Sequence, residues 1–241
     1  MIENIPLVLN IDTATDVCSV ALSKGSTVLS SLECRESNAH SRMLAVLIDR
    51  LFTNTYFTIG ELDAVAVSRG PGSYTGLRIG VSSAKGIAYA RNIPLIAVDT
   101  LQILALKANK KYKNCLYLPM IDARRMEVYT SLYDSEMNCL KEISADIIDS
   151  DIYARYSAEK IILVGDGAKK CKSVLIDERY VLDEEIYLQA KDMVELSYGR
   201  YIKKEFEDVA YFEPYYLKEF IAIKSKVKGL YNEKMEVRKN K

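Results

Sequence analysis

Short apolar runs and stretches of helical periodicity alternate along the first half of the chain. Residues 7–12 (LVLNID), 17–22 (VCSVAL) and 27–33 (TVLSSLE) are typical of strands joined by tight turns, which predicts an antiparallel meander. Between residues 40 and 53 the apolar positions fall at helical spacing. The elements predicted after it are, in order, a strand at 62–67, a helix at 74–91, a strand at 93–98 and a helix at 101–109.

The second half of the chain partly repeats this order of elements. Strands are predicted at 115–122, 126–133, 139–147 and 161–164, and helices near 168–176 and at 190–206. Two halves that each combine a sheet with helices predict a duplicated α/β fold. A polar, Lys-rich stretch at 107–114 marks the boundary between them. We therefore expect subdomains over residues 1–110 and 111–218, followed by a basic tail over 219–241.

The charge balance and the apolar content narrow the class of protein. Lys plus Arg and Asp plus Glu number 33 each, and 49% of the residues are hydrophobic, so the chain can bury a core. A net charge of zero argues against a broad basic face for nucleic acid. No apolar run approaches the roughly 18 residues of a membrane helix, and the start Met1-Ile2-Glu3-Asn4 lacks the basic region of a signal peptide. We expect a cytoplasmic protein without a membrane span.

Basic residues are concentrated at the C-terminus. From Lys218 to Lys241 there are eight Lys or Arg residues and three Glu, which leaves the preceding 217 residues with a net charge of −5. Such a segment is most often a solvated terminus. The alternative is a contact with RNA or with an acidic partner.

Five cysteines and a single histidine exclude most familiar catalytic and metal sites. The cysteines are odd in number, scattered and never spaced C-x-x-C, which argues against a disulfide framework and against a Cys-rich zinc site. His40 is the only histidine, and no Gly-x-Ser-x-Gly elbow supplies a nucleophile. We therefore predict no catalytic residue and no metal ligand.

Two turns carry residue types that suit a phosphate. Residues 68–80 (SRGPGSYTGLRIG) follow a predicted strand and open a helix, and N–H groups at a helix start can hold an anion when glycine permits close approach. Asp12-Thr13 ends the first predicted strand and suits a phosphate or a magnesium-bound water. Both stretches equally suit structural turns, and the glycine spacing matches neither the dinucleotide fingerprint nor a Walker loop. The candidate nucleotide or phosphate contacts are Asp12, Thr13, Gly70, Gly72 and Ser73.

Two predicted helices carry more small and apolar surface than one sheet can cover. In helix 74–91 the residues Gly76, Gly80, Ala84 and Ala88 form one stripe, and Ile79, Ser83, Gly86 and Ala90 form a second row. In helix 40–53 the apolar side chains cover well over half of the circumference, whereas a stripe a little over about 100° wide is enough for a helix on one sheet. The excess indicates either a partner-binding surface or packing between the two helices. The candidate partner-binding residues are Met43, Leu44, Leu47, Leu51, Tyr74, Gly76, Leu77, Gly80, Ala84 and Ala88.

Several segments together resemble a known bacterial family. IDTATDVCSVAL, SRGPGSYTGLRIGVSSAKGIA, IPLIAVDTL, MIDARRMEVYTSLYD and FEPYYLK resemble the TsaB family of tRNA threonylcarbamoyladenosine biosynthesis proteins, over residues 7 to about 218. The resemblance implies the RNase H-like fold of the actin/hexokinase/Hsp70 superfamily (the actin-like ATPase, or ASKHA, fold). TsaB proteins are the non-catalytic relatives of TsaD, which transfers a threonylcarbamoyl group to an adenosine beside the tRNA anticodon.

The resemblance also implies how this chain acts. In TsaD the segment that matches IPLIAVDTLQILA carries a paired-histidine motif that binds a metal, and this sequence has Asp99, Thr100, Leu101 and Gln102 there. TsaB-type proteins pair with TsaD through the helices that match 40–53 and 74–91, and with the ATPase TsaE they form the tRNA-modifying complex. The implied partners are a TsaD-like subunit, a TsaE-like ATPase, a second copy when the chain is alone, and tRNA mainly through the complex. ATP and metal would be used by the partner subunits, with no cofactor bound tightly by this chain alone.

A different function is a small-molecule kinase or ATPase of the same superfamily. It would use Asp12 and Thr13 together with Gly165-Asp166-Gly167 as a split phosphate clamp. The second phosphate motif of such enzymes is here only MIDARRME, which has Asp122 but no glycine where a phosphate must come close. Direct binding of tRNA by the basic tail is a third hypothesis.

Overall fold

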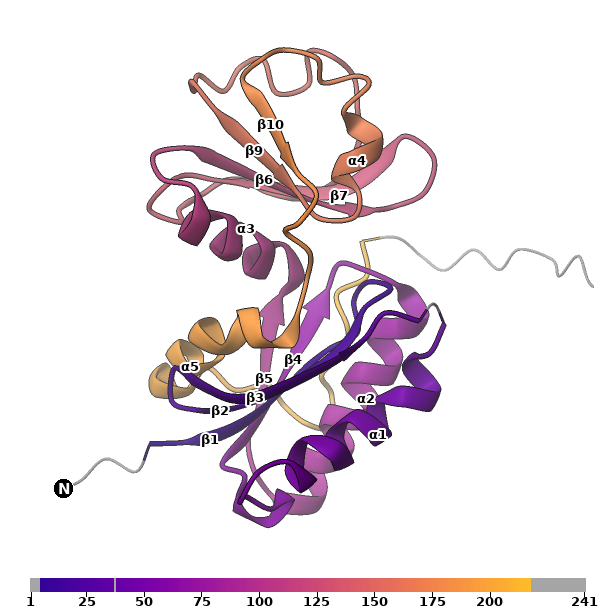
Figure 1. Ribbon diagram of the computed structural model, residues 1–241, viewed down its shortest axis with the longest axis vertical. Helices are drawn as coiled ribbons and strands as arrows, with labels where there is room; N and C mark the ends of the chain where they lie inside the picture. The colour runs from indigo at the N-terminus through magenta and orange to yellow at the C-terminus, as the bar shows by residue number, and fades with distance from the viewer. Residues whose placement is uncertain (1–4, 37, 218–241) are drawn as a thin grey trace, which may run out of the picture.

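A computed structural model describes residues 5–36 and 38–217 and divides them into two lobes (Figure 1). The first lobe contains a mixed sheet in the order β3-β2-β1-β4-β5. β1 is antiparallel to β2 and parallel to β4, and β4 is parallel to β5. Its strands are β1 (Leu7–Asp12), β2 (Cys18–Lys24), β3 (Thr27–Cys34), β4 (Ala64–Gly70) and β5 (Leu95–Asp99).

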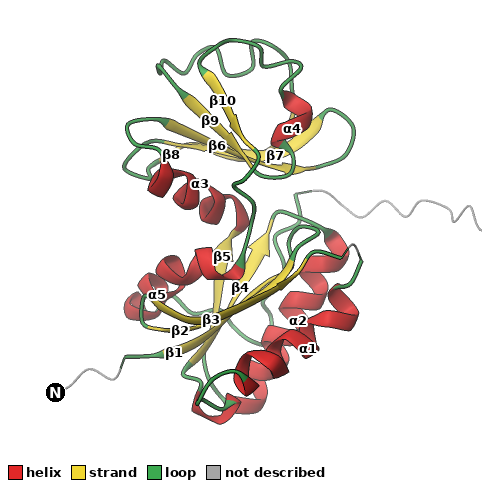
Figure 2. Cartoon of the chain, in the orientation of Figure 1, coloured by secondary structure: helices red, strands yellow, loops and turns green. Residues whose placement is uncertain are grey.

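Helices cover both faces of this sheet (Figure 2). α1 (His40–Thr53) and α2 (Tyr74–Arg91) lie on one face, and α3 (Thr100–Lys111) and α5 (Val194–Lys203) lie on the other. Because successive side chains of a strand point to opposite faces, Leu9 and Ile11 of β1 join the core beneath α1 and α2, whereas Val8 joins the core beneath α3. The central strands are buried on both sides, which explains their nearly continuous apolar sequence.

The second lobe contains the other mixed sheet, in the order β10-β9-β6-β7-β8. The short helix α4 (Ala168–Cys171) contacts β6, and α3 lies between the two sheets and contacts both (Figure 1). Single-turn helices occur at η1 (Ile59–Glu61) and η2 (Ala190–Met193). The strands of this lobe are β6 (Leu116–Asp122), β7 (Glu127–Tyr133), β8 (Cys139–Ile147), β9 (Ile161–Val164) and β10 (Tyr180–Asp183).

The expected duplicated architecture, two mixed sheets flanked by helices, is confirmed. Three local predictions in the second half were wrong. Strand β10 was not predicted, because it spans only Tyr180–Asp183 and its first three side chains are half-buried. The helix expected over 168–176 ends at Cys171. The helix expected over 190–206 begins as the single turn η2 and continues as α5 to Lys203.

The C-terminal helical segment does not stay with the second lobe. The expected subdomain over 111–218 includes η2 and α5, but both pack on the first sheet, η2 against β1, β2 and β3 and α5 against β1 and β5. Ser197 of α5 donates a hydrogen bond to Asn10 Oδ1 of β1 at 2.7 Å, and both residues are buried. The boundary near residue 110 therefore separates the sheets, whereas residues 190–203 belong to the first lobe. The predicted tail over 219–241 lies outside the described residues.

Candidate functional site

The two turns with phosphate-like chemistry meet at one edge of the first sheet. β1 and β4 run parallel, so Asp12 and Gly70, which end these strands, lie at the same edge. The turn after β4 is fixed to the turn after β1 by the Ser73 N–H, which donates to the carbonyl of Ala14 at 2.7 Å. Ser73 is the N-cap of α2, and its hydroxyl accepts from the Gly76 N–H at 3.3 Å.

Small residues at the start of α2 let this helix lie directly on the end of β1. Thr13 is fully buried, and its hydroxyl donates to the carbonyl of Gly76 at 2.7 Å. A Cβ at Gly76 would overlap the Thr13 carbonyl oxygen, and a Cβ at Gly80 would overlap the Thr13 hydroxyl. A Cβ at Gly72 would overlap the Ala14 carbonyl oxygen. The glycines therefore serve a close contact within the chain.

This geometry favours the structural reading of the candidate phosphate contacts. Asp12 and Thr13 have no exposed surface, so their side chains cannot meet a nucleotide in this structure. Gly70 is buried and faces the carbonyl of Tyr215, and Gly72 faces Ala14. Ser73 is exposed but already caps α2, and a phosphate contact there stays a prediction.

Asp12 is an unusual acid in this turn. Its Oδ1 accepts from the Ala14 N–H at 3.3 Å, while its buried Oδ2 has no hydrogen-bond partner among the described residues. Two further hydroxyl oxygens, Ser68 Oγ near the end of β4 and Thr100 Oγ1 at the start of α3, are also buried, and neither has a hydrogen-bond partner among the described residues. Burial raises the pKa of Asp12 to about 7, because a charged carboxylate loses its hydration inside the protein. Near neutral pH Asp12 is thus partly a neutral acid.

The glycine-rich turn of the second lobe is also closed on itself. A Cβ at Gly165 would overlap the carbonyl oxygen of Met120, and one at Gly167 would approach the backbone of Ile121 within 2.8 Å. Asp166 Oδ1 accepts from the Asp122 N–H at 3.0 Å, and Lys170 pairs with the Asp122 carboxylate. The residues expected to form a split phosphate clamp therefore hold their own turn together.

The candidate partner-binding residues divide into a buried group and an accessible pair. Met43 and Tyr74 are half-buried. The other eight residues were predicted to lie on the surface, and this was wrong. They are buried inside the first lobe, against the sheet or against the end of β1. The packing of α1 and α2 on the same sheet accounts for them. The buried residues are Leu44, Leu47, Leu51, Gly76, Leu77, Gly80, Ala84 and Ala88.

An open apolar groove of about 660 Å³ does exist between α1 and α2. Gly86 contributes to its lining, and a Cβ at this position would meet nothing within 4 Å. Ile59, which lines the groove, is 41% exposed. Val46, which follows the lining residue Ala45 in the sequence, is 37% exposed. The row Ile79, Ser83, Gly86 and Ala90 was the sequence signal that pointed toward it. The groove is lined by Ala45, Ile48, Asp49, Phe52, Phe57, Thr58, Ile59, Ser83, Gly86 and Ile87.

Residues 205–217, the C-terminal strap, cross the first lobe beside α2. Glu207 N–H donates to the carbonyl of Leu95 at 2.9 Å, and Tyr215 N–H donates to the carbonyl of Arg69 at 2.7 Å. Lys85 of α2 donates to the strap carbonyls of Ala210 and Phe212 at 3.2 and 2.8 Å. The strap thus occupies one flank of α2 and leaves the groove beside α1 open.

In the segment that matched a metal motif, Asp99 is engaged in ion pairs. Asp99 lies between two guanidinium groups, 2.7 Å from Arg69 and 3.4 Å from Arg200, and its side chain is 14% exposed. Arg200 also donates to Gln102 Oε1 at 3.4 Å. Two cations beside one carboxylate disfavour a metal cation at the same place.

Among the described residues, no helix combines the length and the apolar content needed to cross a bilayer.

Comparisons with known proteins agree with the resemblance seen in the sequence. A family model described as TsaD, tRNA N6-adenosine threonylcarbamoyltransferase, matches residues 35–211. The tRNA threonylcarbamoyladenosine biosynthesis protein TsaB of Escherichia coli (strain K12) is 31% identical over 224 residues, which are 90% of this chain and 96% of that protein. TsaB of Bacillus subtilis (strain 168) is 35% identical over 139 residues, or 58% of this chain and 60% of that protein.

Solved structures support the same assignment. YeaZ from Pseudomonas aeruginosa superposes with a TM-score of 0.79 at 27% identity and covers 88% of this chain and 100% of that chain. The ethanolamine utilization protein EutJ from Carboxydothermus hydrogenoformans, with a TM-score of 0.52 at 8% identity, covers 79% of this chain and 90% of that chain and shares the fold alone. The expected arrangement of two mixed sheets flanked by helices is shared with these structures, and the chain belongs to the TsaB family of tRNA threonylcarbamoyladenosine biosynthesis proteins.

Proposed function

We propose that this chain is a non-catalytic subunit that supports threonylcarbamoyl transfer to the adenosine beside the tRNA anticodon. Its family membership supports a role in making tRNA threonylcarbamoyladenosine. In this proposal the chain pairs with a TsaD-like subunit, which holds the metal and performs the transfer. A TsaE-like ATPase then joins the pair and uses ATP, and tRNA is bound mainly by the assembled complex in the cytoplasm.

The observation that carries the proposal is the groove between α1 and α2. It is about 660 Å³ in volume and its lining is almost entirely apolar, with Asp49 as the single charged residue. Burial of apolar surface is a main favourable contribution to protein association, and an open glycine lets a partner backbone come close. Gly86 is such a glycine. A partner helix with a narrow apolar ridge fits this shape.

The interior of the fold supports a role without chemistry of its own. Asp12 and Thr13, the acid and hydroxyl expected from the sequence to contact a phosphate, have no exposed surface. Asp99 is held by Arg69 and Arg200. A subunit whose polar groups are engaged internally contributes to a reaction chiefly through its surface, and the groove is the apolar part of that surface.

When the chain is alone, a second copy occupies the groove in this proposal. An exposed apolar surface of this kind favours association, and the same groove cannot hold a second copy and a TsaD-like subunit at once. The homodimer and the heterodimer are therefore expected to compete.

The test is a matched pair of glycine substitutions. Gly86→Arg fills the groove, and Gly199→Arg places the same side chain on α5; at both positions a Cβ meets nothing within 4 Å. Both changes replace a helical glycine, so each is expected to be tolerated by the monomer. We expect Gly86→Arg to abolish co-elution with a TsaD-like subunit on gel filtration and Gly199→Arg to preserve it. Co-elution preserved by both variants would refute the groove as the binding surface.

A further inference from the structure

Two stretches of chain join the lobes within the described residues. The first is α3, which leads from β5 to β6. The second, residues 184–193, leads from β10 through η2 to α5 (Figure 1). The short helix η2 contacts α3 as well as β1, β2 and β3. Any rotation of the second lobe against the first must bend or shift these two connections.

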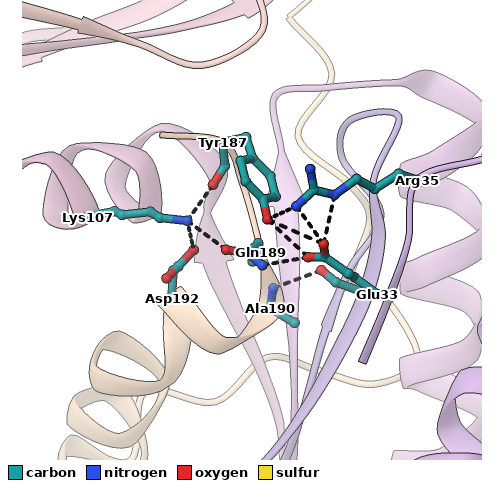
Figure 3. A network of polar contacts seen from close by, with 8 residues as sticks. Glu33, Arg35, Lys107, Tyr187, Gln189, Ala190 and Asp192 are labelled. Carbon is teal, nitrogen blue, oxygen red and sulfur yellow. Dashed lines mark hydrogen bonds and ion pairs between the residues drawn. The ribbon is translucent and has the colours of Figure 1, made fainter. Parts of the chain in front are cut away.

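Lys107 ties the first connection to the second. Its ammonium group, on α3, donates to the Tyr187 carbonyl at 2.8 Å, to Gln189 Oε1 at 2.8 Å and to Asp192 Oδ2 at 2.7 Å (Figure 3). The three donors of an ammonium group are thereby all used. The Lys107 and Asp192 side chains are 21% and 15% exposed, so water screens this pair only in part.

Gln189 connects this contact to the edge strand of the first lobe. Its Oε1 accepts from Lys107, and its Nε2 donates to Glu33 Oε2 of β3 at 2.5 Å (Figure 3). An amide has one acceptor end and one donor end, so only one orientation of the buried Gln189 side chain satisfies both neighbours. The Gln189 amide therefore couples the contact at α3 to the contact at β3.

Further contacts fasten the second connection beside Gln189. The Ala190 N–H donates to the hydroxyl of Ser19 on β2 at 2.8 Å. The Tyr187 hydroxyl contacts the Glu33 carboxylate, and Arg35 contacts both residues and lies over the Tyr187 ring at 4.3 Å. The second connection is thus attached to β2 and β3 on one side and to α3 on the other.

We propose that Lys107, Gln189 and Glu33 form a clasp that ties the two connections to each other and to β3, and thereby fixes the angle between the two lobes. Loss of either end leaves Gln189 with an unsatisfied group, and loss of Lys107 also leaves the Asp192 carboxylate unpaired. The second connection then gains freedom, and the lobe angle varies. The clasp is a property of this chain alone and does not depend on the groove or on its occupant.

The test measures the distance between the lobes in the full chain. Spin labels are placed through Ser82→Cys in the first lobe and Lys160→Cys in the second, both at exposed positions. Cys34 and Cys139 are replaced by Ser, while the other three cysteines are buried. Labelled protein is diluted with unlabelled protein, so that each measured distance by pulsed electron paramagnetic resonance lies within one molecule.

Lys107→Met removes one end of the clasp, and Lys110→Met is its control, because Lys110 lies on the same helix in an exposed pair with Glu195. We expect Lys107→Met to broaden the distance distribution at least twofold and Lys110→Met to leave it unchanged. Gln189→Leu removes the hydrogen bonds to both Lys107 and Glu33 and leaves an uncharged side chain of similar size. This variant tests the clasp if Lys107→Met does not fold. Distributions as narrow as the wild type in the folded clasp variants would overturn the proposal.

Discussion

The Thr13 hydroxyl donates to the Gly76 carbonyl at 2.7 Å, so the end of β1 and the first turn of α2 are in direct contact. This contact explains the two glycines in the first half of α2, Gly76 and Gly80. A side chain at Gly76 or Gly80 would overlap Thr13, whereas a side chain at Gly86 would enter open space. One helix therefore carries glycines with two different roles, internal packing at its start and an open groove further along.

These two roles predict opposite effects of the same substitution. Gly80→Ala forces the added methyl group against the Thr13 hydroxyl, and overpacking of this kind costs about 1 to 3 kcal/mol. Gly86→Ala meets no atom within 4 Å and removes a helical glycine, which adds about 1 kcal/mol of stability. Urea unfolding of both variants measures the difference. Equal free energies of unfolding would contradict the assigned roles.

The buried acid at the end of β1 predicts a pH dependence of stability. Burial raises the pKa of Asp12 from 3.8 to about 7, so folding favours the protonated form. The stability contributed by this protonation is fully present below pH 3.8 and is lost as the pH rises through about 7. Between pH 5 and pH 8 we expect wild type to lose roughly 2 to 3 kcal/mol relative to Asp12→Asn.

The free energy of unfolding of wild type and of Asp12→Asn is measured by chemical unfolding between pH 5 and pH 8. The contributions of the other titrating groups cancel in the difference between the two proteins. A difference that stays constant with pH would show that Asp12 does not titrate there.

The ion pairs around Asp99 predict a structural role for this residue. Asp99→Asn leaves Arg69 and Arg200 facing each other across a poorly exposed site, and we expect a loss of about 1 to 3 kcal/mol in the free energy of unfolding. Asp151→Asn is the control, since Asp151 lies away from the groove and its exposed carboxylate has no ion pair among the described residues. Thermal unfolding of the two variants checks this, and a Tm as high for Asp99→Asn as for its control would count against the role.

The basic tail allows a prediction about tRNA. If tRNA is bound mainly by the assembled complex, deletion of residues 219–241 leaves the affinity of the complex for tRNA within about twofold at each salt concentration. Direct binding by the tail would instead add phosphate contacts, and each contact steepens the dependence of affinity on salt. Affinities of the full and shortened chains, measured at several salt concentrations, separate the two. A weaker affinity with a flatter salt dependence would assign the contact to the tail.

Local signals in the sequence predicted most of the elements correctly. The helix at 74–91 was found with its observed ends, because Ser73 is a good N-cap and small and apolar residues continue to Ala90. Strand β10 was missed because its residues are only partly buried and lie beside one other strand, β9. The placement of α5 on the first lobe was missed because it depends on contacts between residues far apart in sequence, such as Ser197 with Asn10.

The candidate site shows a different limit of sequence reasoning. A row of small residues on a helix indicates that another segment packs closely against it, but it does not show whether that segment belongs to the same chain or to a partner. For Gly76 and Gly80 the neighbour is Thr13 of the same chain, and for Gly86 the space is open. The resemblance to the TsaB family pointed to these two helices, and the structure shows which part of their surface is open.

The rate of threonylcarbamoyl transfer to tRNA by a TsaD-like subunit with a TsaE-like ATPase tests the central claim most directly. The reaction is measured with wild type, with Gly86→Arg and with Gly199→Arg added at equal concentration. We predict that Gly86→Arg lowers the initial rate at least tenfold, to the level without this chain, while Gly199→Arg supports the wild-type rate. A wild-type rate with Gly86→Arg would contradict the account, because the reaction would then not need the groove between α1 and α2.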